Sequence, residues 1–286
     1  MTDGTLFVVA TPIGNLEDLS PRARQILREV ELVASEDTRR TGRLLSHFGI
    51  RTGQVALHEH NEATASKRII EALSEGRSVA LVSDAGTPLI SDPGYRLLRA
   101  AHDAGKTVCP VPGPSALIAA LSVAGLATDR FCFEGFLSAK SSGRRAQLAA
   151  LKNEQRTLVF YEAVHRIAAT ITDMRDILGA TRDAFIGREL SKMHEQCVLA
   201  PLESLVQKLA DSTIPAKGEF VIVVAGAPES AELLSLDTDT LLQRLAPLMP
   251  PRKAAEIVAE ASGQRRNAVY QRILELTRDE ARKEPS

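Results

Sequence analysis

The residues with the clearest chemical potential form the run SDAGTPLISDPG, which spans Ser83 to Gly94. The run follows an apolar strand pattern and precedes a helical one, and open α/β sheets bind ligands at this end of their strands. Glycine lets a ligand approach the backbone, and proline fixes the directions of neighbouring amides and carbonyls. An ordinary turn has a similar composition, but the length and position of this run favour a ligand site.

Two more loops of this kind follow strand patterns. TPIGNL (residues 11–16) comes after the first apolar run, and PGPSA (residues 112–116) leads from a strand into a helix whose first N–H groups are free to bind a ligand. Turn formation or helix initiation alone would also explain either loop. Because parallel strands end at one edge of a sheet, we expect all three loops to line one pocket.

Charged residues follow two other strands. In SEDTRR (residues 35–40), a helix cap at Asp37 or Thr38 would account for the presence of only one of these residues. The two carboxylates and two guanidinium groups together would suit recognition of phosphate or ribose. Both interpretations stay open. In HEHNE (residues 58–62), histidines two apart on an extended segment point to opposite faces, so no metal site is predicted, although one histidine could accept a proton.

Composition and missing motifs exclude several classes of protein. The 286 residues carry a net charge of −1, so contacts with a polyanion must come from local basic clusters. No G-x-G-x-x-G follows the first strand and no G-x-x-x-x-G-K-[ST] occurs, which argues against nicotinamide and nucleoside triphosphates. Three isolated cysteines predict neither disulfides nor a zinc knuckle. With no membrane-spanning run and no secretion signal, we expect a cytoplasmic protein.

The apolar runs predict an α/β fold. In the first half they alternate with helical patterns, which indicates a mainly parallel sheet, and in the second half they lie closer together, which indicates a mixed sheet. We expect an N-terminal α/β domain at residues 1–113 and a second α/β domain at 114–228. The expected strands are residues 6–10, 30–35, 55–57, 79–83, 107–111, 130–136, 157–161, 184–189, 196–200 and 219–225.

The C-terminal part predicts a small helical module at residues 237–286, after a polar linker at 228–238. Two helices separated by Ser262-Gly263, the second opening with Arg265 and Arg266, match a helix-turn-helix layout. A simple helical hairpin fits equally, but the basic side chains favour RNA or DNA. A second basic stretch, KSSGRR at 140–145, reads as a flexible loop that could touch phosphate.

Eight motifs carry a resemblance to a known family. They are TPIGNL (11–16), ASEDTRRTG (34–42), HEHNE (58–62), SDAGTPLISDPGYRL (83–97), VPGPSA (111–116), FEGFL (133–137), FYEAVHR (160–166) and KGEFV (217–221). In order along nearly the whole chain, they resemble the bacterial small-subunit ribosomal RNA (cytidine-2′-O)-methyltransferases of the tetrapyrrole methylase superfamily. The resemblance implies a two-domain tetrapyrrole-methylase-like fold, S-adenosylmethionine in the cleft between the domains, a homodimer, and small-subunit ribosomal RNA or the small ribosomal subunit as partner.

Site residues follow from the resemblance position by position. The implied cofactor-binding residues are Pro12, Gly14, Asp84, Gly86, Thr87, Pro88, Ile90, Pro112, Gly113, Ser115, Ala116 and Tyr161. A ribose 2′-oxygen would attack the sulfonium methyl in line, and aligning the two reactants would supply most of the acceleration. The candidate bases are Glu36, Asp37 and His60, with Arg39 positioning phosphate, and the sequence does not choose among them. The candidate RNA contacts are Arg144, Arg145, Arg265 and Arg266.

Two alternatives remain at this point. The acceptor could be a carbon of a tetrapyrrole, although the basic segments would then have no evident role. The protein could also be a regulator without enzymatic activity, in which the α/β part senses a small ligand and the helix-turn-helix binds DNA. Fold-level analogy does not decide the acceptor.

Overall fold

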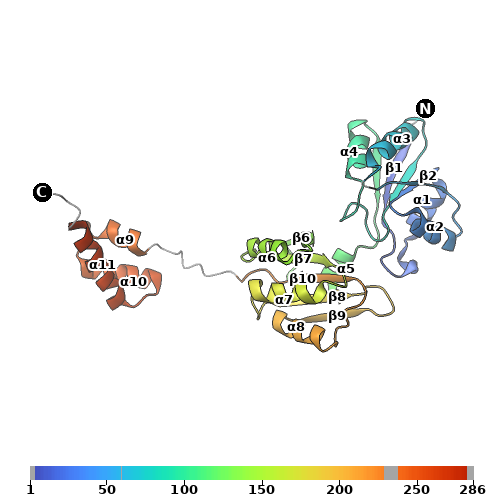
Figure 1. Ribbon diagram of the computed structural model, residues 1–286. Coiled ribbons are helices and arrows are strands. Elements are labelled where there is room, and N and C mark those ends of the chain that lie inside the picture. The colour runs from blue at the N-terminus through green and yellow to red at the C-terminus, as the bar shows by residue number, and fades with distance from the viewer. Residues whose placement is uncertain (1–3, 59, 229–237, 282–286) are drawn as a thin grey trace. The chain divides into compact units, whose positions relative to one another are not determined.

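A computed structural model describes residues 4–58, 60–228 and 238–281. The chain divides into two compact units, Met1–Ala227 and Pro228–Ser286. The first unit contains two five-stranded sheets, and the second contains helices (Figure 1). The domain boundary expected at residues 113 and 114 lies between the last strand of the first sheet and the helix that follows it. Most of the expected linker, residues 229–237, lies outside the described residues.

The first sheet is entirely parallel, with the strand order β3-β2-β4-β1-β5. Its strands are β1 (Thr5–Val9), β2 (Leu32–Ser35), β3 (Gly53–Ala56), β4 (Val79–Val82) and β5 (Thr107–Val111). Helices α1 (Pro21–Glu29) and α2 (Thr38–His47) contribute to the core on one face, and α3 (Glu62–Ser74) and α4 (Tyr95–Asp103) to the core on the other. A 3₁₀ turn, η1 (Leu16–Asp18), follows β1. The parallel arrangement brings the strand-end loops to one edge.

The second sheet is mixed, with the order β6-β7-β10-β8-β9 and a parallel β6–β7 pair beside antiparallel neighbours. Its strands are β6 (Phe131–Phe136), β7 (Thr157–Glu162), β8 (Asp183–Arg188), β9 (Gln196–Pro201) and β10 (Phe220–Val224). Helices α6 (Ser141–Ala150), α7 (Ile167–Leu178) and α8 (Leu202–Ala210) cover one face, and α5 (Ala116–Val123) packs on the other. Helix α5 directly follows the first sheet, so it connects the two halves of the unit.

All ten strands expected from the sequence form, and the predicted α/β class with one parallel and one mixed sheet is confirmed. One local prediction is wrong: residues 140–145 are not a flexible loop, because Ser141 begins α6. Leu148 of this helix is fully buried in the core against the sheet, and this packing outweighs the glycine and serines in the segment.

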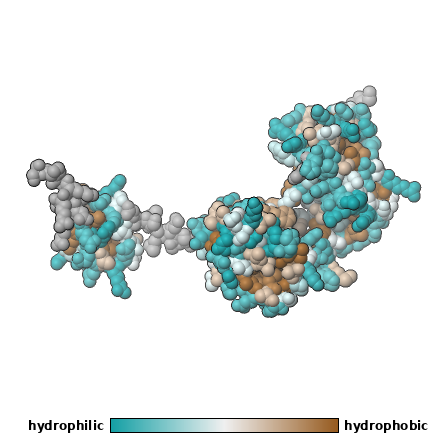
Figure 2. All heavy atoms as spheres, in the orientation of Figure 1, coloured by the Kyte–Doolittle hydropathy of each residue, from teal (hydrophilic) through white to brown (hydrophobic). Residues whose placement is uncertain are grey.

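The C-terminal unit contains α9 (Thr238–Leu245), α10 (Pro251–Ser262) and α11 (Arg266–Ala281) around a core that includes Leu242, Val258 and Ile273. Gly263 ends α10 in the left-handed conformation, with φ of 66°, as expected for the turn between the two predicted helices. Hydrophilic residues cover much of the visible surface of both units (Figure 2). Among the described helices, none is long and apolar enough to cross a bilayer.

Candidate functional site

The three strand-end loops are hydrogen-bonded to one another. Thr11 and Gly86 form an isolated antiparallel bridge, in which each backbone N–H donates to the other's carbonyl at 2.9 and 3.0 Å. The Thr11 hydroxyl donates to the carbonyl of Ser83 at 3.2 Å, and the Thr87 hydroxyl donates to that of Pro114 at 3.1 Å. The loops after β1, β4 and β5 therefore form a single surface, as the sequence predicted.

The loop after β4 contains a strained backbone. Gly86 has φ of 81°, and the two non-glycine residues Leu89 and Ser91 have φ of 76° and 70°. A left-handed conformation at an ordinary residue costs on the order of 1 kcal/mol or more, and such residues concentrate at ligand sites. The loop thus holds a particular shape in front of the strand.

Helix α4 is capped by a residue from another helix. The Glu62 carboxylate, at the start of α3, accepts hydrogen bonds from the backbone N–H groups of Gly94 at 3.1 Å and Arg96 at 2.8 Å. Asp92 precedes Pro93, a pair typical of a helix start, but α4 begins only at Tyr95. Because Glu62 accepts these N–H groups, Asp92 is not used as the cap and lies in the pocket described next.

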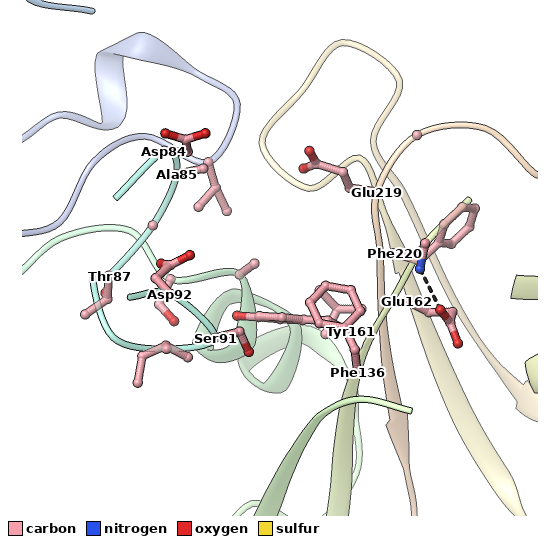
Figure 3. A pocket seen from close by; sticks show the side chains of 18 of the residues that line it. Asp84, Ala85, Thr87, Ser91, Asp92, Phe136, Tyr161, Glu162, Glu219 and Phe220 are labelled. Atoms are coloured by element: carbon pink, nitrogen blue, oxygen red, sulfur yellow. Dashed lines mark hydrogen bonds between the residues drawn. The ribbon is translucent and has the colours of Figure 1, made fainter. Parts of the chain in front are cut away.

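A pocket of about 600 Å³ lies between the strand-end loops and the second sheet, within the range of small-molecule sites. In Figure 3, Asp84, Thr87 and Asp92 lie on one wall, and Phe136, Tyr161 and Glu219 lie opposite. The Tyr161 hydroxyl accepts a hydrogen bond from the backbone N–H of Leu117 at 3.2 Å, which fixes its ring at the start of α5. The lining residues are Ile13, Glu36, Arg40, Asp84, Ala85, Gly86, Thr87, Ile90, Ser91, Asp92, Ser115, Ala116, Phe136, Tyr161, Glu162, Ala163, Val164, His165, Gly218, Glu219, Phe220 and Val221.

Carboxylates outnumber basic side chains in this lining. The acidic residues are Glu36, Asp84, Asp92, Glu162 and Glu219, and the basic ones are Arg40 and His165. Such a pocket favours a ligand that carries positive charge. The loops supply backbone polar groups and the second sheet supplies aromatic rings, so the pocket can also hold a planar group.

Burial in the pocket shifts two pKa values. The pKa of Asp92 is raised to about 6, mainly because the carboxylate is partly desolvated and also because Glu36 and Asp84 repel its charge, while a hydrogen bond from Ser83 lowers it. Desolvation also raises the pKa of Tyr161, and the charge of Asp92 adds to this effect. The two groups therefore lie close enough in the pocket to interact.

Comparisons with known proteins identify the family. The family described as Tetrapyrrole (Corrin/Porphyrin) Methylases matches residues 5–206, and the RsmI C-terminal HTH domain matches residues 232–277. The chain is 53% identical over 277 residues to Ribosomal RNA small subunit methyltransferase I of Pseudomonas aeruginosa, with 96% of this chain and 98% of that protein covered. The chain belongs to this methyltransferase family. The counterpart from Synechocystis is 46% identical over 279 residues, which cover 96% of this chain and 99% of that protein.

Solved structures show the fold of this methyltransferase family member. A uroporphyrin-III C-methyltransferase from Thermus thermophilus, complexed with S-adenyl homocysteine, is 19% identical and superposes with a TM-score of 0.55, covering 78% of this chain and 97% of that one. Cobalt precorrin-4 methyltransferase is 13% identical, with a TM-score of 0.57 over 77% of this chain and 94% of that one. The tetrapyrrole-methylase-like fold predicted from the motifs is confirmed.

The cofactor residues predicted for this methyltransferase lie in two groups. Those that line the pocket are Asp84, Gly86, Thr87, Ile90, Ser115, Ala116 and Tyr161. Pro12, Gly14, Pro88, Pro112 and Gly113 belong to the same loops but are not among the lining residues. Two of these glycines allow close packing: a Cβ at Gly113 would lie 3.0 Å from that of Ala10, and one at Gly14 would overlap the side chain of Lys192.

The predicted catalytic residues of the methyltransferase do not all reach the pocket. Glu36 lines it, but Asp37, Arg39 and His60 do not. Asp37 caps α2 by accepting from the backbone N–H of Arg39 at 2.8 Å, and the Arg39 guanidinium lowers the pKa of its carboxyl to about 2. A carboxylate held so strongly in its charged form is a poor proton acceptor at neutral pH, which argues against Asp37 as the base.

The predicted RNA contacts differ in exposure. Arg144 is buried, and its guanidinium pairs with the Asp173 carboxylate at 2.7 Å, so the structure contradicts the prediction that Arg144 touches RNA. Arg145 is partly exposed and contacts the same aspartate at 2.6 Å. In the C-terminal unit Arg265 and Arg266 are exposed, and Arg266 pairs with Glu256 at 3.3 Å.

Several residues that line the pocket of the methyltransferase were not among the predicted site residues. The lining residues within the quoted motifs that were not singled out are Ile13, Arg40, Ala85, Ser91, Asp92, Phe136, Glu162, Ala163, Val164, His165, Gly218, Glu219, Phe220 and Val221. Their signal was present, because each lies beside a strand end within a motif that carried the resemblance. What the motifs did not reveal was which side chain of each segment turns inward.

Proposed function

We propose that the protein transfers a methyl group from S-adenosylmethionine to the 2′-oxygen of a cytidine in small-subunit ribosomal RNA. The observation that carries the proposal is the 53% identity over 96% of the chain to a protein named Ribosomal RNA small subunit methyltransferase I. The cytidine and the 2′-oxygen come from the motif resemblance described above. The pocket and the basic surface beside it add physical support.

S-adenosylmethionine is the cofactor of this methyltransferase family, and the pocket residues fit it. When bound, it supplies an activated methyl group on a sulfonium centre. The excess of carboxylates suits its sulfonium and ammonium charges, and the rings of Phe136 and Tyr161 can pack against its adenine. The residues proposed to hold it are Pro12, Gly14, Asp84, Gly86, Thr87, Pro88, Ile90, Pro112, Gly113, Ser115, Ala116 and Tyr161.

Three of the pocket carboxylates are held by neighbouring groups and so shape the site. Asp84 accepts the backbone N–H of Asp37 at 3.1 Å and pairs with Arg40 at 3.3 Å. Glu162 pairs with Arg166 at 2.8 Å, and Lys192 binds Glu219 at 2.9 Å. These contacts join the end of β2 to β4, and the loop after β8 to β10. They keep both walls of the pocket in place.

A basic helix face beside the pocket supports a polyanionic acceptor. Arg39, Arg40 and Arg43 of α2 are exposed, and Arg40 also lines the pocket. With an overall charge of −1, attraction to RNA must come from such local groups. We propose that Arg39 contacts phosphate from this helix, and that Arg145, Arg265 and Arg266 contribute further contacts.

We also propose that the protein acts as a homodimer in the cytoplasm, where ribosomal subunits are found. Ile118 and Val123 of α5 are 53% and 55% exposed, and Leu199 of β9 is 48% exposed. Leu199 lies against Gly125, just after α5, so these apolar groups are neighbours on one face of the second sheet. Light scattering coupled to gel filtration would measure the mass in solution.

The test is incubation of the purified protein with methyl-labelled S-adenosylmethionine and small ribosomal subunits from a strain that lacks this modification. Digestion and nucleoside analysis should locate the label in 2′-O-methylcytidine. Subunits that already carry the modification are the matched control and should take up no label. Label in another nucleoside would correct the acceptor, and label only in an added tetrapyrrole would contradict the proposal.

A further inference from the structure

Asp92 differs in its contacts from three other carboxylates of the pocket. Asp84, Glu162 and Glu219 each pair with a basic side chain, whereas among the described residues no lysine, arginine or histidine pairs with Asp92. The hydroxyl that lowers its pKa is the neutral one of Ser83, which also donates to the backbone carbonyls of Ala85 and Gly86 at 3.3 Å. A half-buried carboxylate with no cation beside it lowers the stability of the folded protein. Such a group is therefore a candidate for a role in binding or catalysis.

The fold positions Asp92 at some expense to the backbone. It follows Leu89 and Ser91, whose left-handed conformations turn the chain twice within three residues. The helix after it is capped by Glu62 rather than by Asp92, which leaves this carboxylate available to the pocket. Figure 3 shows it opposite Tyr161, whose hydroxyl accepts the Leu117 N–H and can still donate its own proton.

We propose that Asp92 is the general base that receives the proton of the ribose 2′-hydroxyl during methyl transfer, an inference that rests on the proposed function. The 2′-oxygen forms a bond to the methyl carbon as its proton moves to the Asp92 carboxylate. The carbon–sulfur bond breaks, and its electron pair stays on sulfur, which becomes a neutral thioether. Asp92 then releases the proton to water, so atoms and charge balance.

The surroundings of Asp92 suit this role. Partial desolvation and the negative charges of Glu36 and Asp84 bring its pKa to about 6, so the group is ionised at neutral pH yet binds a proton far better than Asp37, with a pKa of about 2. Bases whose pKa lies near the working pH are the most effective in general catalysis. Tyr161 of β7 faces Asp92. Arg40 also lines the pocket, but its guanidinium pairs with Asp84 and not with Asp92.

The experiment compares the full-length wild type with Asp92→Asn, which preserves the shape of the side chain and removes its basicity. Single-turnover methyl transfer to unmodified small subunits is measured from pH 5 to 8.5, and S-adenosylhomocysteine binding is measured by calorimetry. We expect Asp92→Asn to lose on the order of 100-fold or more in rate, with affinity changed by less than about threefold. The wild-type rate should rise tenfold per pH unit up to a pKa near 6, and Asp103→Asn, at the exposed end of α4, is the matched control.

A second variant separates Asp92 from Glu36. If Asp92 is the base, Glu36→Gln should keep a pH-dependent rate but shift the profile to lower pH, because Glu36 raises the pKa of Asp92. If Glu36→Gln abolishes the rate and Asp92→Asn leaves it within about threefold of wild type, the proposal is wrong. A loss of more than tenfold in S-adenosylhomocysteine affinity for Asp92→Asn would also overturn it, by making Asp92 a binding residue. Wild-type protein that methylates nothing would instead refute the proposed function, and the inference with it.

Discussion

Asp92→Asn should make the protein more stable at neutral pH while it impairs methyl transfer. The pKa of Asp92 is higher in the folded protein than in the unfolded chain, so the folded state binds this proton more tightly. Stability is therefore unaffected by this group below the unfolded value of 3.8, falls as the pH rises from there, and is lowest above about 6. Asparagine carries no charge, so the stability of the variant does not fall in this way as the pH rises.

The size of the effect follows from the shift. A change from 3.8 to about 6 corresponds to an upper limit of about 3 kcal/mol, since one pKa unit equals about 1.4 kcal/mol. Asp92 is only partly buried, and water in the pocket screens its charge, so we expect about 1–2 kcal/mol at pH 7.5. For a unit of this length that corresponds to roughly 2–8 °C in melting temperature.

Thermal unfolding followed by circular dichroism at pH 7.5 and pH 4.5 would measure the difference in the absence of any ligand. The variant should melt at the higher temperature at pH 7.5, and the gap should shrink to less than half at pH 4.5. Asp103→Asn should change the melting temperature little at either pH, because it removes one exposed i, i+4 ion pair with Arg99. A variant that is no more stable than wild type at pH 7.5, or equally stabilised at both values, would refute the argument.

Three further substitutions test other contacts. Glu62→Ala leaves two backbone N–H groups at the start of α4 without their acceptor, so the free energy of unfolding from urea titrations should fall by about 2–4 kcal/mol. Cofactor binding should weaken as well. Unchanged stability and affinity would refute the capping role of Glu62. Tyr161→Phe removes the acceptor of the Leu117 N–H and should weaken S-adenosylhomocysteine binding several-fold by calorimetry, and equal affinity would contradict this. Arg144→Ala removes the guanidinium that pairs with the buried Asp173 carboxylate and should lower the free energy of unfolding by about 3–5 kcal/mol. The RNA affinity of the protein that remains folded should not change, and a reduced affinity would restore a role for Arg144 in binding RNA.

The strands and the pocket loops could be predicted because their signals are local. Apolar β-branched runs mark each strand, and glycine and proline mark the strand ends, so periodicity and turn chemistry were sufficient. The parallel order then brings the loops together, and the Thr11–Gly86 bridge shows how directly they meet. The loop at residues 140–145 failed as a prediction because burial of Leu148 against the second sheet outweighs the local composition.

The roles of individual charged residues could not be predicted, because they depend on partners far away in the sequence. Asp92 stands before a proline, as helix caps often do, but Glu62, thirty residues earlier, accepts the backbone N–H groups at the start of α4. Arg144 looked like an exposed phosphate contact, but Asp173 of the next helix holds it inside the protein. The short-range pattern Asp37-x-Arg39 was ambiguous, and the structure resolves it as a helix cap with a surface ion pair.

Helix α5 links the pocket to the folding of the whole first unit. The chain passes from the first sheet to the second through this helix, and Ser115, Ala116 and the Leu117 N–H at its start belong to the pocket or hold Tyr161. A ligand in the pocket would contact residues of both halves of the unit at once, so it would bind only when both sheets are folded. By mass action, the occupied unit should unfold as one cooperative block, whereas in the free protein either sheet could open without the other.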